Sequence, residues 1–172
     1  GYMAKNEWVY DKTNDSWFYL KSNGRVAQNE WYGNYYLKAD GSMAKNEWVY
    51  DKSYKSWFYL KSDGHYAQNE WKGKYYLKKG GYMAKNEWVY DNTYKAWFYL
   101  KSDGSYANLE WQKVDGKWYY FKKWGYMAKN EWQESYFLNT QGAMMQNEWL
   151  YDNTYKSWFY LKSDGSYANL EW

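Results

Sequence analysis

The sequence predicts an all-β fold, a solenoid of stacked β-hairpins in which long and short units alternate. Two observations lead to this prediction. The phrase G-x-x-A-x-x-E-W, once with Met in place of Ala, occurs nine times in 172 residues, and a short aromatic run separates each copy from the next. Repeats of this length indicate small units that bury their apolar faces against their neighbours.

The spacing of the phrase defines the units. The intervals between successive copies are 23, 17, 23, 17, 23, 21, 17 and 23 residues, so the higher period is 40. The repeats begin at Gly1, Gly24, Gly41, Gly64, Gly81, Gly104, Gly125, Gly142 and Gly165. We therefore expect one repeat module over residues 1–172. Because the pattern is already running at Gly1 and still running at Trp172, we also expect a fragment of a longer protein.

Each interval contains an aromatic tetrad, of which Trp17-Phe18-Tyr19-Leu20 is the first. The equivalent runs start at Asn34, Trp57, Lys74, Trp97, Trp118, Ser135 and Trp158. Together with the preceding E-W phrase, each tetrad predicts one hairpin. A lone hairpin is marginal in water, so the hairpins must stack.

The three turn lengths predict a single common register. In every case the E-W tryptophan faces the third tetrad residue. The predicted pairs are Trp8 with Tyr19, Tyr10 with Trp17, Trp31 with Tyr36, Tyr32 with Tyr35, Trp111 with Tyr120, and Lys113 with Trp118. Since side chains alternate, Trp8, Tyr10, Trp17 and Tyr19 share one face, whereas Phe18 points the other way and belongs to the core.

Composition excludes several functional classes. Phe, Trp and Tyr make up 27% of the chain, and Cys and Pro are absent, which removes disulfides and cysteine-type zinc sites. The 23 basic and 20 acidic residues are interspersed, which argues against nucleic acid. The sequence contains no apolar run of the roughly 20 residues that a membrane span needs. We expect no metal and no cofactor.

Aromatic rings from successive hairpins can enclose a quaternary ammonium. Such a cation has no N–H to donate and is held by ring quadrupoles at about 0.5–2 kcal/mol per ring. Three rings then support only about millimolar to sub-millimolar affinity. Several such cages facing a polymer that carries many cations would raise avidity by about 10² or more.

The units resemble the choline-binding repeats of pneumococcal-type surface proteins, and the resemblance covers the whole chain. It is carried by Trp111-Gln-Lys-Val-Asp-Gly-Lys-Trp-Tyr-Tyr-Phe, by Gly-Tyr-Met-Ala, by A-K-N-E-W-V-Y-D-K and by the 23/17 spacing. These features are most similar to the modules of endo-β-N-acetylglucosaminidases that separate daughter cells. The resemblance implies a secreted, wall-bound module that binds the phosphocholine of teichoic and lipoteichoic acids and targets such a hydrolase.

In that family, two aromatic residues of one hairpin and one of the next form a site, often beside a Met. Carried onto this chain, the implied sites are Trp8, Trp17 and Tyr36 with Met43; Trp48, Trp57 and Tyr76 with Met83; Trp88, Trp97 and Tyr120 with Met127; and Trp111, Trp118 and Phe137 with Met144. Trp149 and Trp158 form a last pair. The short units depart from the pattern at Asn34, Lys74 and Ser135, so cages at Trp31, Trp71 and Trp132 need another wall, such as Tyr10, Tyr50, Tyr90 or Tyr151.

Other interpretations stay open. Related aromatic repeats bind glucans, and the same solenoid could be a structural stalk. Catalysis within these residues is the least favoured, since nothing resembles a nucleophile with its base. The repeated Glu residues are expected to accept backbone N–H groups and His65 to be a surface residue. Exposed terminal aromatics could also promote self-association.

Overall fold

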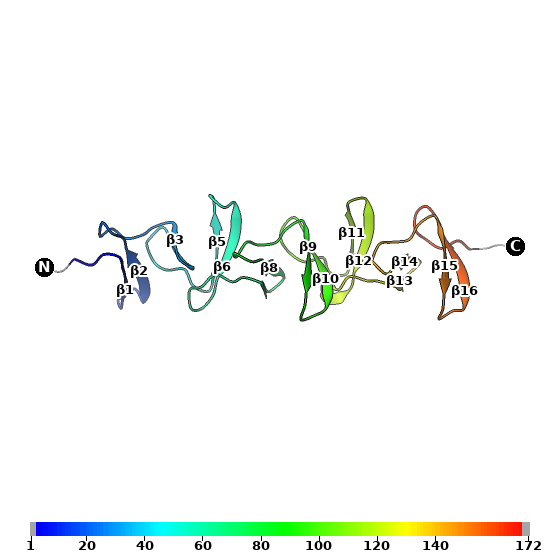
Figure 1. Cartoon of the computed structure of the whole chain (residues 1–172), viewed down its shortest axis with the longest axis horizontal. Helices are drawn as coiled ribbons and strands as arrows, with labels where there is room; N and C mark the ends of the chain where they lie inside the picture. Colours follow the sequence, from blue (N-terminus) through cyan, green and yellow to red (C-terminus); the bar gives the residue numbers. More distant parts are fainter. Residues whose placement is uncertain (1–2, 170–172) are drawn as a thin grey trace. The chain divides into compact units, whose positions relative to one another are not determined.

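The computed structural model describes residues 3–169, and its regular elements are sixteen strands and one short 3₁₀ helix. The repeat start at Gly1 and the last E-W pair, which includes Trp172, lie outside the described residues. Within the described chain, every sheet is a two-stranded antiparallel hairpin, and successive hairpins follow one another along the sequence (Figure 1). The predicted fold class is therefore confirmed.

The chain divides into two compact units, Gly1–Ala84 and Lys85–Trp172. The expectation of a single module over residues 1–172 stays a prediction. The first unit contains β1 (Glu7–Asp11), β2 (Ser16–Leu20), β3 (Glu30–Tyr32), β4 (Tyr35–Leu37), β5 (Glu47–Asp51), β6 (Ser56–Leu60), β7 (Glu70–Lys72) and β8 (Tyr75–Leu77). The second contains β9 (Glu87–Asp91), β10 (Ala96–Leu100), β11 (Glu110–Val114), β12 (Lys117–Phe121), the 3₁₀ helix η1 (Lys123–Gly125), β13 (Glu131–Gln133), β14 (Tyr136–Leu138), β15 (Glu148–Asp152) and β16 (Ser157–Leu161).

The predicted register is confirmed in all three kinds of hairpin. In the first long hairpin Trp8 faces Tyr19 and Tyr10 faces Trp17. The short hairpin pairs Trp31 with Tyr36 and Tyr32 with Tyr35. The hairpin of intermediate length pairs Trp111 with Tyr120 and Lys113 with Trp118. Turn length therefore changes without moving any aromatic residue to the opposite face.

In six of the connectors, a backbone hydrogen bond reaches past the hairpin just before the connector to the hairpin before that one. The Met43 N–H donates to the Trp17 carbonyl at 2.8 Å, and the Met144 N–H donates to the Trp118 carbonyl at 2.8 Å. At a short hairpin, the Tyr66 N–H donates to the Asn34 carbonyl at 3.2 Å. In these connectors, the third residue of the phrase is thus held beside the first tetrad residue of the hairpin that lies one hairpin further back in the chain. This bond places the methionines next to the exposed tryptophans.

The core is a row of small and aliphatic side chains between the hairpins. The tetrad leucines, for example Leu37 and Leu60, are fully buried, and so are the connector alanines Ala44 and Ala84. Of the tetrad phenylalanines, Phe58 is 3% exposed whereas Phe18 is half-buried. Tyr54 and Tyr82 pack on Phe58, with ring centroids 6.0 and 5.3 Å away. The first hairpin has Asn14 and Ser42 at those positions, which explains why Phe18 is less covered.

The repeated Glu residues close the connectors, as the sequence predicts. Glu30 Oε2 accepts the Gln28 N–H at 3.2 Å and the Lys21 ammonium at 3.3 Å. The same pattern recurs at Glu47, Glu70, Glu110 and Glu131. The side chains of these ion pairs are partly exposed to solvent, so each pair contributes only about 0–1 kcal/mol. No helix within residues 3–169 has the length and apolar character needed to cross a membrane.

Candidate functional site

Each long hairpin presents two tryptophans on one face, one from each strand. In the β9–β10 hairpin, the Trp88 and Trp97 ring centroids lie 6.3 Å apart with the ring planes at 89°. Trp88 is half-buried, whereas Trp97 is 42% exposed. The two rings therefore form an open corner at the protein surface.

Residues of the following repeats complete this corner. The Tyr119 ring, from β12, lies 4.8 Å from Trp88 at an interplanar angle of 75°. Met127 donates its N–H to the Trp97 carbonyl at 3.3 Å, which holds its side chain beside the ring. Trp88, Trp97, Tyr119, Met127 and Gln141 line a cavity of about 270 Å³. Three rings and a thioether thus surround a space open to solvent.

Three other hairpins repeat the contact between the E-W tryptophan and the next tetrad. The ring of Trp8 lies 5.2 Å from Tyr35, that of Trp48 lies 5.4 Å from Tyr75, and that of Trp111 lies 5.4 Å from Tyr136. The exposed tryptophans of these hairpins are Trp17, Trp57 and Trp118, and the adjacent connector residues are Met43, Met83 and Met144. The two tryptophans and the methionine named from the resemblance therefore occupy equivalent positions in every copy.

The third ring of each site differs from the residue that the resemblance implies. Tyr36, Tyr76, Tyr120 and Phe137 instead contact the E-W tryptophan of their own hairpin, at 5.0 Å from Trp31, 5.0 Å from Trp71, 5.2 Å from Trp111 and 5.2 Å from Trp132. The reason is side-chain alternation, because the third tetrad residue is the cross-strand partner of that tryptophan. The second tetrad residue points the other way, toward the preceding hairpin. The rings that lie against the E-W tryptophan of the preceding hairpin are those of Tyr35, Tyr75, Tyr119 and Tyr136, and the ring that closes each site stays a prediction.

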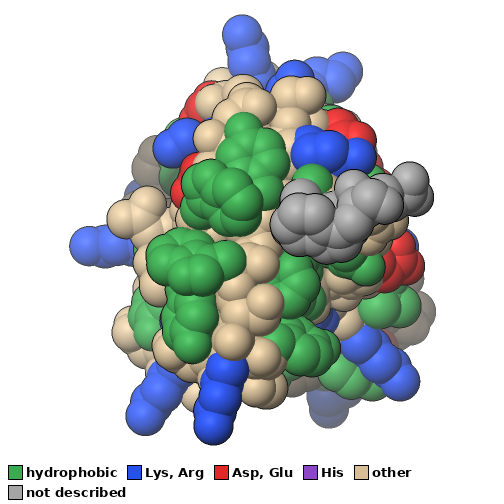
Figure 2. All heavy atoms as spheres, turned by 90° about the vertical axis from the view of Figure 1, so that its right-hand side faces the viewer, with side chains coloured by type: hydrophobic (Ala, Val, Ile, Leu, Met, Phe, Trp, Pro, Cys, Tyr) green, Lys and Arg blue, Asp and Glu red, His purple; other side chains and the backbone are tan. Residues whose placement is uncertain are grey.

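The last pair of tryptophans lies on a more exposed surface. Trp149 contacts Tyr160 at 5.1 Å, and Trp158, which is 61% exposed, contacts Tyr151 at 5.3 Å. Figure 2 views the side of the molecule on which β15 and β16 lie in Figure 1, and shows hydrophobic side chains gathered there with Lys and Arg side chains projecting around them. Self-association through such a surface stays a prediction.

A fourth aromatic residue borders the exposed tryptophan of four hairpins. Tyr10, Tyr50, Tyr90 and Tyr151 lie 5.3, 5.4, 5.2 and 5.3 Å from Trp17, Trp57, Trp97 and Trp158. These tyrosines were candidates for the missing walls of the short hairpins, but their ring contacts are with the long hairpins. In the β11–β12 hairpin, Lys113 takes this position, and its ammonium lies 6.0 Å from the Trp118 ring.

Lysines of the protein itself lie over two more ring faces near these sites. The Lys72 ammonium is 4.7 Å from the Tyr59 ring, and the Lys74 ammonium is 5.9 Å from the Tyr75 ring. In the first repeat, the equivalent of Lys72 is Tyr32, which stacks on Tyr19 at 3.7 Å. A hydrogen bond with Tyr32, together with burial, raises the pKa of Tyr19 to about 12. The ring faces around the sites therefore suit cations and other rings.

Residues 3–169 contain no group of three or more His, Cys, Asp or Glu side chains that could hold a metal ion. His65 Nε2 lies 3.0 Å from the Tyr35 hydroxyl and its Nδ1 lies 3.0 Å from an Asp63 oxygen. These contacts place His65 between its own turn and Tyr35 of β4, and its side chain is 41% exposed, which agrees with the expected surface position of His65.

Two families of repeats match the sequence. The "Choline-binding repeat" matches residues 25–66, and the "Putative cell wall binding repeat" matches residues 6–26, 86–106, 110–127 and 147–167. Together these matches cover most of the chain. Residues 25–66 contain two hairpins, and each of the other four matched segments contains one.

Solved structures from Streptococcus pneumoniae share the fold. The choline-binding domain of CbpL is 44% identical, with a TM-score of 0.60, and the match covers 98% of this chain and 99% of that domain. The modular autolysin LytC is 50% identical, with a TM-score of 0.55, over 96% of this chain. The likeness to CbpL therefore extends over the complete length of that domain.

A third relative is matched over a much shorter segment. It is the "Putative endo-beta-N-acetylglucosaminidase" of Streptococcus pneumoniae serotype 4, 50% identical over 36 residues. That match spans 21% of this chain and 6% of the relative, and this chain spans 43% of the LytC structure. Both relatives thus extend well beyond the part that resembles this chain.

Proposed function

Because the chain belongs to the choline-binding repeat family, we propose that it attaches a larger protein to the bacterial cell wall by holding choline groups in its aromatic cages. The observation that carries this proposal is the cavity of about 270 Å³ bounded by Trp88, Trp97, Tyr119 and Met127. The equivalent cages are those of Trp8, Trp48 and Trp111. The module itself is non-catalytic.

The chemistry of the cage suits a quaternary ammonium. The methyl groups of choline fill the corner between perpendicular rings, where the ring quadrupoles attract a diffuse cation. No Asp or Glu lines the cavity, so selectivity for methylated cations comes from the rings and the thioether. Each cage binds at about millimolar affinity once association entropy is subtracted.

Several weak cages on one chain together bind a polymer much more tightly than one cage binds a single choline group. The phosphocholine groups of teichoic and lipoteichoic acids form a polymer with many cations, and occupying a second cage becomes an intramolecular step. A secreted, wall-bound protein would use this avidity to stay at the surface while single cages open and close. The carried protein is a peptidoglycan hydrolase, an endo-β-N-acetylglucosaminidase that acts in daughter-cell separation.

A calorimetric titration with choline chloride tests the proposal. We expect saturation at about millimolar choline, reproduced by tetramethylammonium, with more than one site per chain. The Trp97→Ala variant should lose one site, because it removes a wall of the cavity while the neighbouring hairpins keep theirs. Binding of choline-bearing teichoic acid should weaken more than binding of free choline, because avidity is lost as well.

Trp124→Ala is the matched control. Trp124 is 63% exposed and lies in η1 rather than in the cavity, so its removal takes away an exposed tryptophan but no cage wall. The number of choline sites should stay unchanged in this variant. A wild-type chain that shows no saturable response to choline or tetramethylammonium would overturn the proposal.

A further inference from the structure

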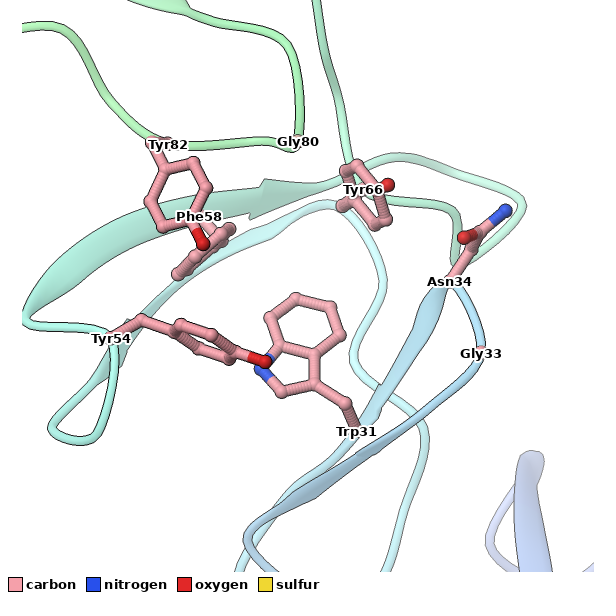
Figure 3. A pocket seen from close by; sticks show the side chains of 8 residues that line it. All are labelled: Trp31, Gly33, Asn34, Tyr54, Phe58, Tyr66, Gly80 and Tyr82. Atoms are coloured by element: carbon pink, nitrogen blue, oxygen red, sulfur yellow. The ribbon is translucent and has the colours of Figure 1, made fainter.

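A second kind of cavity lies at the short hairpin of the first unit. Trp31, Gly33, Asn34, Tyr54, Phe58, Tyr66, Gly80 and Tyr82 line a space of about 190 Å³. Figure 3 shows the Trp31 and Tyr54 rings on one side of it and the Tyr82, Phe58 and Tyr66 rings on the other. The residues come from the β3–β4 and β5–β6 hairpins and from the connectors that follow β6 and β8.

The walls of this cavity differ in chemistry from those of the choline cages. Asn34 stands where the long hairpins have their exposed tryptophan, and Tyr66 stands where they have a connector methionine. The exchange puts an amide in place of an indole and a phenol in place of the thioether, so two polar groups are gained while the number of rings stays the same. A site built for a quaternary ammonium gains nothing from these groups, because that cation neither donates nor accepts a hydrogen bond.

The polar groups at the rim are available to a ligand. Among residues 3–169, no hydrogen-bond partner is found for the Asn34 amide or for the hydroxyls of Tyr54, Tyr66 and Tyr82. Tyr54 is 55% exposed, so its hydroxyl and the outer face of its ring are open to solvent. Apolar walls combined with a few convergent polar groups are typical of sites for small polar organic ligands.

The rings are held in place before any ligand arrives. Asp51 accepts the Trp31 indole N–H at 2.8 Å through Oδ2 and the Tyr54 backbone N–H at 3.0 Å through Oδ1. Phe58 packs against Trp31 at 5.1 Å and against Tyr82 at 5.3 Å. Ordering these side chains therefore costs little free energy when a ligand binds.

The arrangement recurs in the second unit. Trp132 lies 5.1 Å from Phe159 and 5.9 Å from Tyr167, matching the 5.1 and 5.9 Å that separate Trp31 from Phe58 and Tyr66. Tyr155 takes the place of Tyr54, at 5.9 Å from Phe159, and Ser135 takes the place of Asn34. A polar residue thus again replaces the exposed tryptophan.

We propose that this second kind of cavity binds a pyranose ring of a glycan chain, so that the module contacts sugar as well as choline. A sugar has an apolar face that fits the aromatic walls and a rim of hydroxyls that can bond to Asn34 and to the tyrosine hydroxyls. The volume is below the roughly 300–1,000 Å³ of sites for drug-sized ligands, so it accommodates one ring of the chain. The inference does not depend on choline binding.

The test is a titration of the ¹⁵N-labelled chain with the tetramers of N-acetylglucosamine and of glucose, in parallel with choline. The Trp31 indole N–H, identified with Trp31→Phe, reports on the second cavity, and the Trp97 indole N–H reports on a choline cage. We expect a saturable shift of the Trp31 signal with at least one tetramer at about millimolar concentration. Choline should shift the Trp97 signal and leave that of Trp31 in place.

Tyr54→Ala and Tyr82→Ala should each weaken the sugar response of Trp31 by about tenfold. Tyr94→Ala is the matched control, because Tyr94 packs on Phe98 as Tyr54 packs on Phe58 and lies in the second unit. It should leave the Trp31 response unchanged. The inference would be overturned if the Trp31 signal did not shift with either tetramer, or if it shifted with choline instead. This holds whether or not the Trp97 signal responds to choline.

Discussion

The indole N–H of Trp31 donates a 2.8 Å hydrogen bond to the Asp51 carboxylate, which joins a short hairpin to the loop of the next long hairpin. The other carboxylate oxygen accepts the Ser53 and Tyr54 backbone N–H groups at 2.8 and 3.0 Å. Asp152 repeats the arrangement with Trp132 at 2.7 Å. One side chain thus fixes the loop and holds the ring that faces it.

Replacing Asp51 with Asn tests this relationship. The Asn side-chain oxygen can still accept the loop N–H groups, but its NH₂ then faces the indole N–H, donor against donor. We expect the Asp51→Asn variant to lose about 1–2 kcal/mol of unfolding free energy, measured by urea denaturation, and the Trp31 indole signal to shift.

Asp11→Asn is the matched control for that change. Asp11 accepts the Thr13 N–H at 2.9 Å and the exposed Asn14 side chain, at the equivalent position of the first hairpin. The same substitution there should cost less, because Asn14 can turn toward water. Equal losses in the two variants would contradict a stabilising role for the indole bond.

The Asp152 carboxylate predicts a specific response to acid. Its hydrogen bonds from the Tyr155 backbone and the Trp132 indole hold the pKa of Asp152 below its ordinary value. The stabilisation is therefore complete above about pH 3.9, the usual pKa of Asp, and is lost as pH falls through the lower folded-state pKa. The Trp132 indole N–H signal should move with a midpoint below about pH 3.9, and Asp152→Asn should abolish that transition. A midpoint at or above that value would contradict the bonded carboxylate.

The third wall of the cage can be decided by comparing Tyr119 with Tyr120. Tyr119 lies 4.8 Å from Trp88, whereas Tyr120 lies 5.2 Å from Trp111. Tyr119→Ala should weaken choline binding at this cage by about 2- to 30-fold, which corresponds to one ring at 0.5–2 kcal/mol. Tyr120→Ala should lower thermal stability and leave the response of the Trp97 signal to choline intact. The opposite result would restore Tyr120 as the wall.

Hairpins and their register could be predicted from the sequence because both depend on local pattern. Turn length and the alternation of side chains constrain Trp8 and Tyr19, or Trp31 and Tyr36, to face each other whatever the rest of the chain does. The same alternation could also have predicted which tetrad residue faces the tryptophans of the preceding hairpin. Tyr119 and Tyr120 point to opposite faces, and only one of those faces meets the preceding hairpin.

Contacts between hairpins could not be predicted in the same way. The bond from Trp31 to Asp51 and the packing of Tyr54 on Phe58 depend on how far one hairpin rotates relative to the next. Side-chain period within a strand carries no information about that rotation. Tyr50 is one of the four tyrosines that the sequence offers as substitute walls for the short hairpins, but its ring packs on Trp57, and the loop residue Tyr54 borders the cavity at Trp31.

Lys113 gives the β11–β12 cage its own internal cation. Its ammonium lies 6.0 Å from the Trp118 ring, where other long hairpins have a tyrosine. A bound choline must share this ring with the positive charge of Lys113. The Lys113→Gln variant should therefore bind choline at that cage about 2- to 5-fold more tightly, as measured through the Trp118 indole signal. Lys117→Gln removes the same charge from the exposed first residue of β12 in the same hairpin. If both variants changed affinity equally, net charge rather than the contact with Trp118 would be the cause.

Close packing between repeats makes Gly41 more sensitive to substitution than Gly33. Both have positive φ, at +88° and +58°, so an added Cβ costs roughly 1–2 kcal/mol of backbone strain at either position. At Gly41 that Cβ would also lie 2.5 Å from Val26 Cγ1 and 3.1 Å from Phe18 Cδ1, whereas at Gly33 it meets nothing within 4 Å. Gly41→Ala should therefore lower the thermal midpoint more than Gly33→Ala.

A double variant separates the clash at Gly41 from the backbone strain. Val26→Ala removes the methyl group that the new Cβ would strike, so adding it to Gly41→Ala should recover part of the lost stability. The remainder should match the loss in Gly33→Ala, which has strain without a clash. If Val26→Ala instead added its own loss to that of Gly41→Ala, the sensitivity of Gly41 would come from its backbone conformation alone, and close contact between successive repeats would not explain it.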